Sequence, residues 1–285
     1  MTYFAVNDAM IKALGGVLSM FQTVPLRGGL VLLLLGLVVV RSGWNVYNLG
    51  NRDKWILVSR AVAEVGAAFF IVTALFNMKL ANMNAILQIL PLTIPSSAYM
   101  FLGEPLGWRR ITAIIIGFLG MLLIIEPGGE DFSIYSIFCL AAVVCVTIRD
   151  LTARSLGIKI SSQEISFFAA LGVFVAGSCA AFSEPWEGVS LTSWILLSGS
   201  AITIFFGYIV SVLAIQIGEV SFTAQFRYFG LIVTLVLGYI FFGEWPDVWS
   251  LTGSAVIVFT GVFMFFRQRQ KKVAATPIIV CKNNQ

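Results

Sequence analysis

The chain has 285 residues, of which 59% are hydrophobic and only 11% are charged, and its formal net charge is +4. Ordinary soluble domains are about 45–50% apolar and about 25% charged, so this composition excludes a water-soluble globular protein. The chain has no histidine, the commonest zinc ligand, and its four cysteines lack the spacing of a metal site or a disulfide framework. We therefore expect no metal and no other cofactor.

Apolar runs of the length needed to cross a bilayer, about 20 residues, follow one another along the whole chain. In chain order they cover residues 17–40, 55–77, 81–103, 109–126, 133–153, 165–182, 192–215, 220–242 and 249–266. Residues 1–14 are also apolar but form a shorter run, which predicts a short or truncated first helix. The sequence predicts an all-α polytopic membrane protein with ten transmembrane helices.

Basic residues gather in alternate connections between these runs, which predicts the orientation of the chain. The connections on the side of the C-terminal tail, and the tail itself, hold most of them: Arg41, Arg52, Lys54, Arg109, Arg110, Arg149, Arg154, Lys159, Arg267, Arg269, Lys271, Lys272 and Lys282. Cytoplasmic loops favour Lys and Arg, so we expect a multi-pass protein of the inner (plasma) membrane with both termini in the cytoplasm. The basic tail 267–285 is expected to contact anionic membrane lipids, and no nucleic-acid partner is expected.

The two halves of the chain resemble each other. WILVS at 55–59 recurs as WILLS at 194–198, Gly103-Glu104 recurs as Gly243-Glu244, and the Asp8–Lys12 pair recurs as Asp150–Arg154. This register predicts two repeats of five helices each, at 1–128 and 133–266. Because five is an odd number, the second repeat enters the membrane from the opposite side, as in many secondary transporters. The repeat also predicts that residue 1 lies inside the natural first helix, or that this helix is unusually short.

The stretch 74–128 contains an alanine-leucine corner, a helix with a central proline, a Gly-Glu turn and a glycine-rich helix. Together with RDLTARSL at 149–156, it resembles the EamA branch of the drug/metabolite transporter (DMT) superfamily. The resemblance covers nearly the whole chain and occurs twice. It implies a ten-helix fold, a central cavity between the halves, and import or export of a metabolite whose identity it does not specify.

Charged residues inside membrane spans cost about 2.5–3.5 kcal/mol each on insertion scales, so they usually face a cavity or each other. Residues that interrupt a helix, when they lie at matching positions of two repeats, indicate a transporter site, and Pro91 and Gly230 are such a pair. The polar residues predicted to bind substrate lie near these two residues or inside a span: Arg227, Tyr228, Gln88, Gln225 and Arg27. Because a guanidinium binds a carboxylate or phosphate with two parallel hydrogen bonds, the predicted substrate is a small anionic or zwitterionic metabolite.

Several of these residues also have structural interpretations. Arg60 and Glu64 are four residues apart and predict an ion pair on one helix face, with a gate or proton-coupling site as the alternative. Arg27 could instead bind carbonyl groups of neighbouring helices, and Pro91 could simply kink a packed helix. The asparagines Asn77, Asn82 and Asn84 are expected to be capping or loop residues.

The sequence as a whole predicts a secondary transporter that works by alternating access and is not an enzyme. The alternatives are an integral-membrane enzyme acting on a lipid or lipid-linked substrate, and a channel. A metal-dependent enzyme is disfavoured because histidine and a cluster of aspartates are both missing. A proton is the coupling ion considered, and Gly117 and Gly120 would allow a homodimer through glycine-containing helices.

Overall fold

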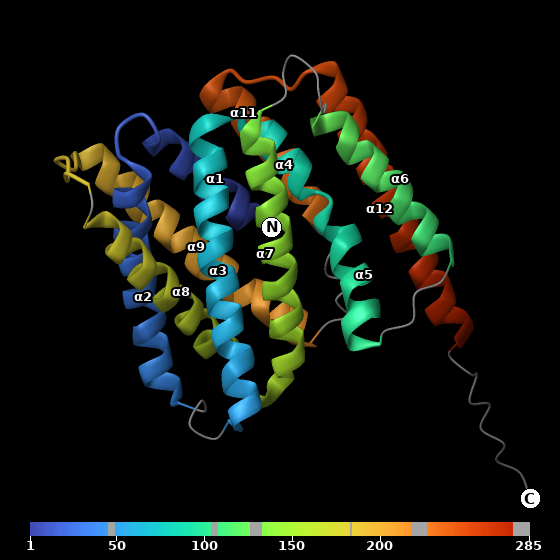
Figure 1. Ribbon diagram of the computed structural model, residues 1–285, viewed down its shortest axis with the longest axis horizontal. Helices are drawn as coiled ribbons and strands as arrows, with labels where there is room; N and C mark the ends of the chain where they lie inside the picture. The colour runs from blue at the N-terminus through green and yellow to red at the C-terminus, as the bar shows by residue number, and fades with distance from the viewer. Residues whose placement is uncertain (45–48, 104–107, 126–132, 183, 218–226, 276–285) are drawn as a thin grey trace, which may run out of the picture.

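The computed structural model describes residues 1–44, 49–103, 108–125, 133–182, 184–217 and 227–275 (Figure 1). Its α-helices are α1 (Thr2–Leu14), α2 (Met20–Ser42), α3 (Asn51–Asn77), α4 (Leu80–Leu87), α5 (Leu90–Leu102), α6 (Trp108–Ile125), α7 (Ile134–Leu156), α8 (Ser162–Ala181), α9 (Leu191–Ile217), α11 (Arg227–Phe242) and α12 (Val248–Ala275). A short 3-10 turn, η2 (Gly157–Lys159), follows α7. This part of the chain contains no strand, which confirms the predicted all-α class.

Five helices are long and apolar enough to cross a membrane, namely α2, α3, α7, α8 and α9. Shorter apolar segments lie in α6, α11 and α12, at Ile111–Ile125, Gly230–Phe242 and Val248–Thr260. Large apolar side chains such as Leu33, Val40 and Phe259 point outward and are more than two-thirds exposed. An outer surface of this kind requires lipid as its solvent, and helices satisfy their own backbone groups there. The protein is therefore a multi-pass membrane protein.

The predicted helix at 81–103 is split in two. α4 ends at Leu87 and α5 begins at Leu90, so the break lies at Gln88 and Ile89, just before Pro91. A proline ring clashes with the carbonyl of the residue four positions earlier, here Leu87, if the helix continues through it. In the first turn of α5 the missing proline N–H has no intrahelical role, so Pro91 is accommodated there.

Helix contacts pair the two halves of the chain. α3 packs on α7 and α1 packs on α9, while α2 packs on α8, α4 on α11 and α6 on α12. If each helix is replaced by its counterpart in the other half, the contact of α3 with α7 becomes the contact of α1 with α9. The contacts of α2 with α8, α4 with α11 and α6 with α12 each map onto themselves. α3 and α7 run antiparallel, because Asp53 contacts Lys159 at one end and Met78 contacts Cys139 at the other. This pattern supports the division into two inverted repeats, which remains a prediction.

α5 and α11 also end in the same way. Gly103 has φ +70° and Gly243 has φ +62°, both in the left-handed region that favours glycine, and each follows the last residue of its helix. These are the glycines of the repeated Gly-Glu turn. Sequence similarity at this turn therefore corresponds to a shared backbone conformation.

Candidate functional site

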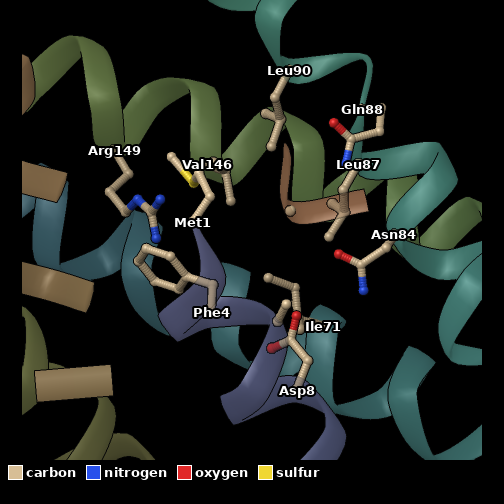
Figure 2. Close-up of a pocket in the computed structure, with 12 residues that line it drawn as sticks. Met1, Phe4, Asp8, Ile71, Asn84, Leu87, Gln88, Leu90, Val146 and Arg149 are labelled. Carbon is tan, nitrogen blue, oxygen red and sulfur yellow. The ribbon is translucent and has the colours of Figure 1, made fainter. Parts of the chain in front are cut away.

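A cavity of about 90 Å³ lies inside the bundle, between α1, the break that separates α4 from α5, and the middle of α7 (Figure 2). Its polar lining residues come from three helices and the break: Asp8 on α1, Asn84 on α4, Gln88 at the break and Arg149 on α7. Among the described residues, the cavity is also lined by Gly230 of α11 and by the apolar residues Met1, Phe4, Ala5, Ile71, Leu87, Leu90 and Val146.

Arg149 is the cationic side chain among the described residues of this lining. It is buried, with 7% of the residue exposed, and its guanidinium faces the cavity in Figure 2. Nη1 donates to Glu64 Oε1 at 3.1 Å and Nε donates to Asp150 Oδ1 at 3.0 Å. No partner in the described part of the chain binds its Nη2. Two carboxylates thus fix the orientation of the guanidinium and leave one of its edges toward the cavity.

The position of Arg149 corrects the sequence analysis, which placed it in a cytoplasmic connection. α7 continues to Leu156, so Arg149 and Asp150 lie inside the helix and are buried there. Burial of an arginine is possible at this position because acidic side chains from α3 and from α7 itself compensate its charge.

Asp8 is the anionic side chain of the lining, and sequence analysis did not include it in the site. It is 8% exposed, and Oδ1 accepts a hydrogen bond from Asn7 Nδ2 at 3.0 Å. In Figure 2 its carboxylate points into the cavity, on the wall opposite Arg149. Its sequence match to Asp150 in the repeat was the one signal that could have identified it.

Two amides line the cavity near the helix break. Gln88, a predicted site residue, is 4% exposed, and its Oε1 has no hydrogen-bond partner among the described residues. Asn84 lies in the last turn of α4 and lines the cavity, so its interpretation as a capping or loop residue is wrong. An unpaired buried amide oxygen is costly in an apolar interior, and a bound ligand would offset that cost.

Glu64 connects three helices beside the cavity. Besides Arg149 of α7, it accepts a hydrogen bond from Tyr208 Oη of α9 at 3.0 Å. Arg60 Nη2 lies 4.0 Å from its other oxygen, as the spacing of four residues predicts, and Arg60 Nη1 donates to the carbonyl of Arg149 at 2.5 Å. Arg60 and Glu64 therefore belong to a buried network that supports Arg149.

The remaining predicted site residues lie elsewhere or fall outside the description. Arg27 is buried, its Nη1 donates to Asn7 Oδ1 of α1 at 3.3 Å, and it is not among the described residues that line the cavity. Arg227 and Tyr228 begin α11, but their side chains, like all of Gln225, lie outside the described residues. Gly230, three residues after Arg227, lines the cavity, whereas Pro91 follows the lining residue Leu90.

Comparison with known proteins matches residues 133–267 to the EamA-like transporter family. The chain is similar to the S-adenosylmethionine uptake transporter of Rickettsia bellii, with 25% identity over 93% of this chain and 90% of that one. It is similar to the pseudopaline exporter CntI of Pseudomonas aeruginosa, with 24% identity over 90% and 89% of the two chains. The riboflavin transporter of Vibrio cholerae is 22% identical over 74% and 70%.

A solved crystal structure shares the fold, with a TM-score of 0.68 and 16% identity over 95% of this chain and 98% of that one. The family match and the relatives confirm the resemblance to the EamA branch of the DMT superfamily. The matched family and these relatives are named as transporters, which agrees with the prediction of a transporter of small metabolites.

Proposed function

With an EamA-like transporter domain at residues 133–267 as the premise, we propose that this protein is a secondary transporter of a small metabolite that carries a carboxylate. The observation that supports the substrate class is Arg149, a buried guanidinium with one edge toward a cavity inside the bundle. A guanidinium binds a carboxylate with good geometry and high charge complementarity. Ionisable residues inside a membrane bundle commonly mark the substrate pathway.

Glu64 and Asp150 act in this proposal as positioning residues. They hold Nη1 and Nε of Arg149, so the free edge is ready for the substrate without reorientation. Glu64 is therefore assigned to the support of Arg149 in preference to proton coupling. Arg227, Tyr228 and Gln225 stay in the proposed site, because Gly230 brings the start of α11 to the cavity.

Alternating access is the proposed mechanism. The cavity of about 90 Å³ is much smaller than pockets that hold a metabolite, which are roughly 300–1,000 Å³. Helices must therefore separate before a substrate enters. At one end of the bundle Lys12 and Glu244 form an ion pair at 2.8 Å, one helical turn beyond Asp8 on α1. We assign this end to the outside of the inner membrane and both termini to the cytoplasm, as the distribution of basic residues predicts.

The relatives narrow the choice of first substrates to test. S-adenosylmethionine, the named substrate of one set of relatives, is an amino-acid derivative with a carboxylate. Riboflavin, the named substrate of another, has no carboxylate. If Arg149 binds the substrate, the chain should favour compounds of the first kind.

The test is saturable uptake by the purified full chain in liposomes, with radiolabelled S-adenosylmethionine and a panel of amino acids as substrates. Arg149→Ala should abolish uptake, and Arg149→Lys should retain a reduced rate because it keeps the charge and loses the forked geometry. Arg52→Ala, at an exposed position of α3, is the matched control and should transport normally. Full uptake by Arg149→Ala would contradict the assignment, and flux without saturation or counterflow would favour a channel.

A further inference from the structure

Asp8 is a buried carboxylate that lacks an ion-pair partner in the described part of the chain. Oδ1 accepts from the neutral amide of Asn7, and the nearby Arg27 donates to Asn7 instead of to Asp8. By contrast, Glu64 and Asp150 both contact Arg149. Buried charges in proteins are normally paired, so a carboxylate that is directed into the cavity and makes no direct ion pair with a described residue favours a ligand with a cationic group.

The surrounding polar groups are suited to the same kind of ligand. Gln88 Oε1 is buried and accepts no hydrogen bond from the part of the chain that the structure describes, and Asn84 lies between Gln88 and Asp8 in Figure 2. An ammonium group carries three donors and no acceptor. It would satisfy the carboxylate of Asp8 and an amide oxygen together.

The walls of the cavity therefore differ in charge. Arg149 of α7 presents a cation on one wall, and Asp8 of α1 presents an anion on the opposite wall (Figure 2). We infer that Asp8, with the amide oxygen of Gln88, forms a subsite for a cationic group of the substrate. The transported metabolite is then a zwitterion with a carboxylate at Arg149 and an ammonium group at Asp8. This inference rests on the proposed function, in which the same cavity binds the carboxylate.

The subsite predicts selectivity that Arg149 alone would not give. Simple carboxylates such as α-keto acids carry no cationic group that could bind Asp8, so the protein should not transport them. The corresponding α-amino acids and their derivatives differ only by the added ammonium group, so they should be accepted. Comparison of such pairs isolates the contribution of Asp8.

The experiment uses liposomes that contain the full chain and a defined mixture of substrates. The mixture holds S-adenosylmethionine, the common α-amino acids, their α-keto acid counterparts and riboflavin, and the compounds that accumulate are measured by mass spectrometry. The variants are Asp8→Asn and Asp8→Glu, with Asp53→Asn as a control for the same chemical change at the bundle surface, where Asp53 pairs with the exposed Lys159. Elution profile and melting temperature are recorded for each variant.

The wild-type chain and Asp53→Asn should accumulate compounds that carry both charges. Asp8→Asn should reduce this accumulation about tenfold or more, since hydrogen bonds to charged groups are the stronger ones, and Asp8→Glu should recover part of it. Accumulation of keto acids or riboflavin by the wild type, or unchanged zwitterion uptake by a folded Asp8→Asn, would overturn the subsite and leave transport itself intact. If the wild type accumulates none of the compounds, both the subsite and the proposed function fail. If Asp8→Asn misfolds, the test rests on the uptake by Asp8→Glu and on whether the wild type prefers each α-amino acid to its α-keto acid counterpart. Equal uptake of the two compounds of a pair by the wild type would overturn the subsite.

Discussion

Arg149 Nη1 lies 3.1 Å from Glu64 Oε1, and this ion pair joins α7 to α3 in the interior of the bundle. Both side chains are less than one-tenth exposed. Tyr208 of α9 donates to the same carboxylate oxygen, so a single acidic side chain links three helices. One of these helices, α3, belongs to the first half of the chain, and the other two belong to the second.

Removal of Glu64 should destabilise the protein strongly. Glu64→Ala leaves the guanidinium of Arg149 without one of its two carboxylate partners, and loss of one member of a buried pair typically costs about 3–5 kcal/mol. Asp53→Ala, which breaks the exposed pair with Lys159, should cost at most about 1 kcal/mol. Chemical unfolding in detergent measures both, and equal losses would contradict the structural role of Glu64.

Glu64→Gln separates that role from proton coupling. The amide oxygen can still accept hydrogen bonds from Arg149 and Tyr208, so we expect a folded protein with slower uptake that still responds to a pH gradient. A variant with normal stability whose uptake no longer responds to the gradient would instead assign proton coupling to Glu64.

The ion pair of Lys12 and Glu244 should control access to the cavity from one end. Lys12 Nζ also donates to the carbonyl of Met78 at 2.6 Å, and Glu244 Oε2 accepts from the backbone N–H of Leu80 at 2.8 Å. Cys139 is 1% exposed and contacts Met78, the residue whose carbonyl binds Lys12, so its thiol serves as a reporter of opening at this end. Glu244→Gln should raise its labelling by a membrane-impermeant thiol reagent several-fold over the wild type.

The labelling is measured in a background with the other three cysteines replaced by serine. Asp247→Asn changes a carboxylate at the same end of the bundle that accepts a hydrogen bond from the backbone N–H of Ser250 near the start of α12, and it should leave labelling unchanged. Equal labelling of the Glu244→Gln and Asp247→Asn proteins would mean that the ion pair does not limit access.

The contact between α6 and α12 depends on glycines that approach closely. A Cβ atom on Gly253 would overlap the carbonyl oxygen of Gly120 and also Ile124 Cγ1. Gly253→Ala should therefore force the helices apart and cost about 1–3 kcal/mol, whereas Gly188→Ala has open space and should change stability by less than about 0.5 kcal/mol. Melting temperatures in detergent provide the comparison, and a Gly253→Ala protein as stable as wild type would contradict the close approach.

This contact also changes the meaning of the glycines on α6. From the sequence, Gly117 and Gly120 are expected to allow a homodimer, but a Cβ on Gly117 would overlap Leu92 of α5, and Gly120 faces α12 of the same chain. Both glycines are used for packing inside one chain. They give no support to a dimer, which stays an untested prediction.

Hydrophobic runs and the repeat predicted most helix positions, because lipid imposes the same length and polarity on each span. The helix break near Pro91 was also predictable, since proline acts through the local backbone. The site was predicted only in part. Arg149 was assigned to a connection because a charged pair near the end of an apolar run has the composition of a loop. Only its three-dimensional neighbours, chiefly Glu64 of α3, show that its charge is compensated in the interior.

Asp8 shows a second limit of sequence analysis. Its helix is short, so an aspartate within it has the pattern of a polar terminus and not of a buried site residue. The structure places it across the cavity from Arg149, in a second helix far away along the chain. Opposite charges contributed by different helices form the site, so the spacing of residues within one helix does not predict it.

Gly230 should limit the size of the side chain that the cavity tolerates on α11. A Cβ atom there would lie 3.5 Å from Met1 Cβ, which is an ordinary contact, so Gly230→Ala should fold and transport. Gly230→Leu adds a branched side chain toward a cavity of only about 90 Å³ and should block uptake by tenfold or more, while the protein still inserts and elutes normally. Val236→Leu adds bulk at a half-exposed position on the same helix and should have no effect on uptake. Wild-type uptake by Gly230→Leu would show that substrate does not occupy this cavity, because the leucine side chain and the metabolite would compete for the same space.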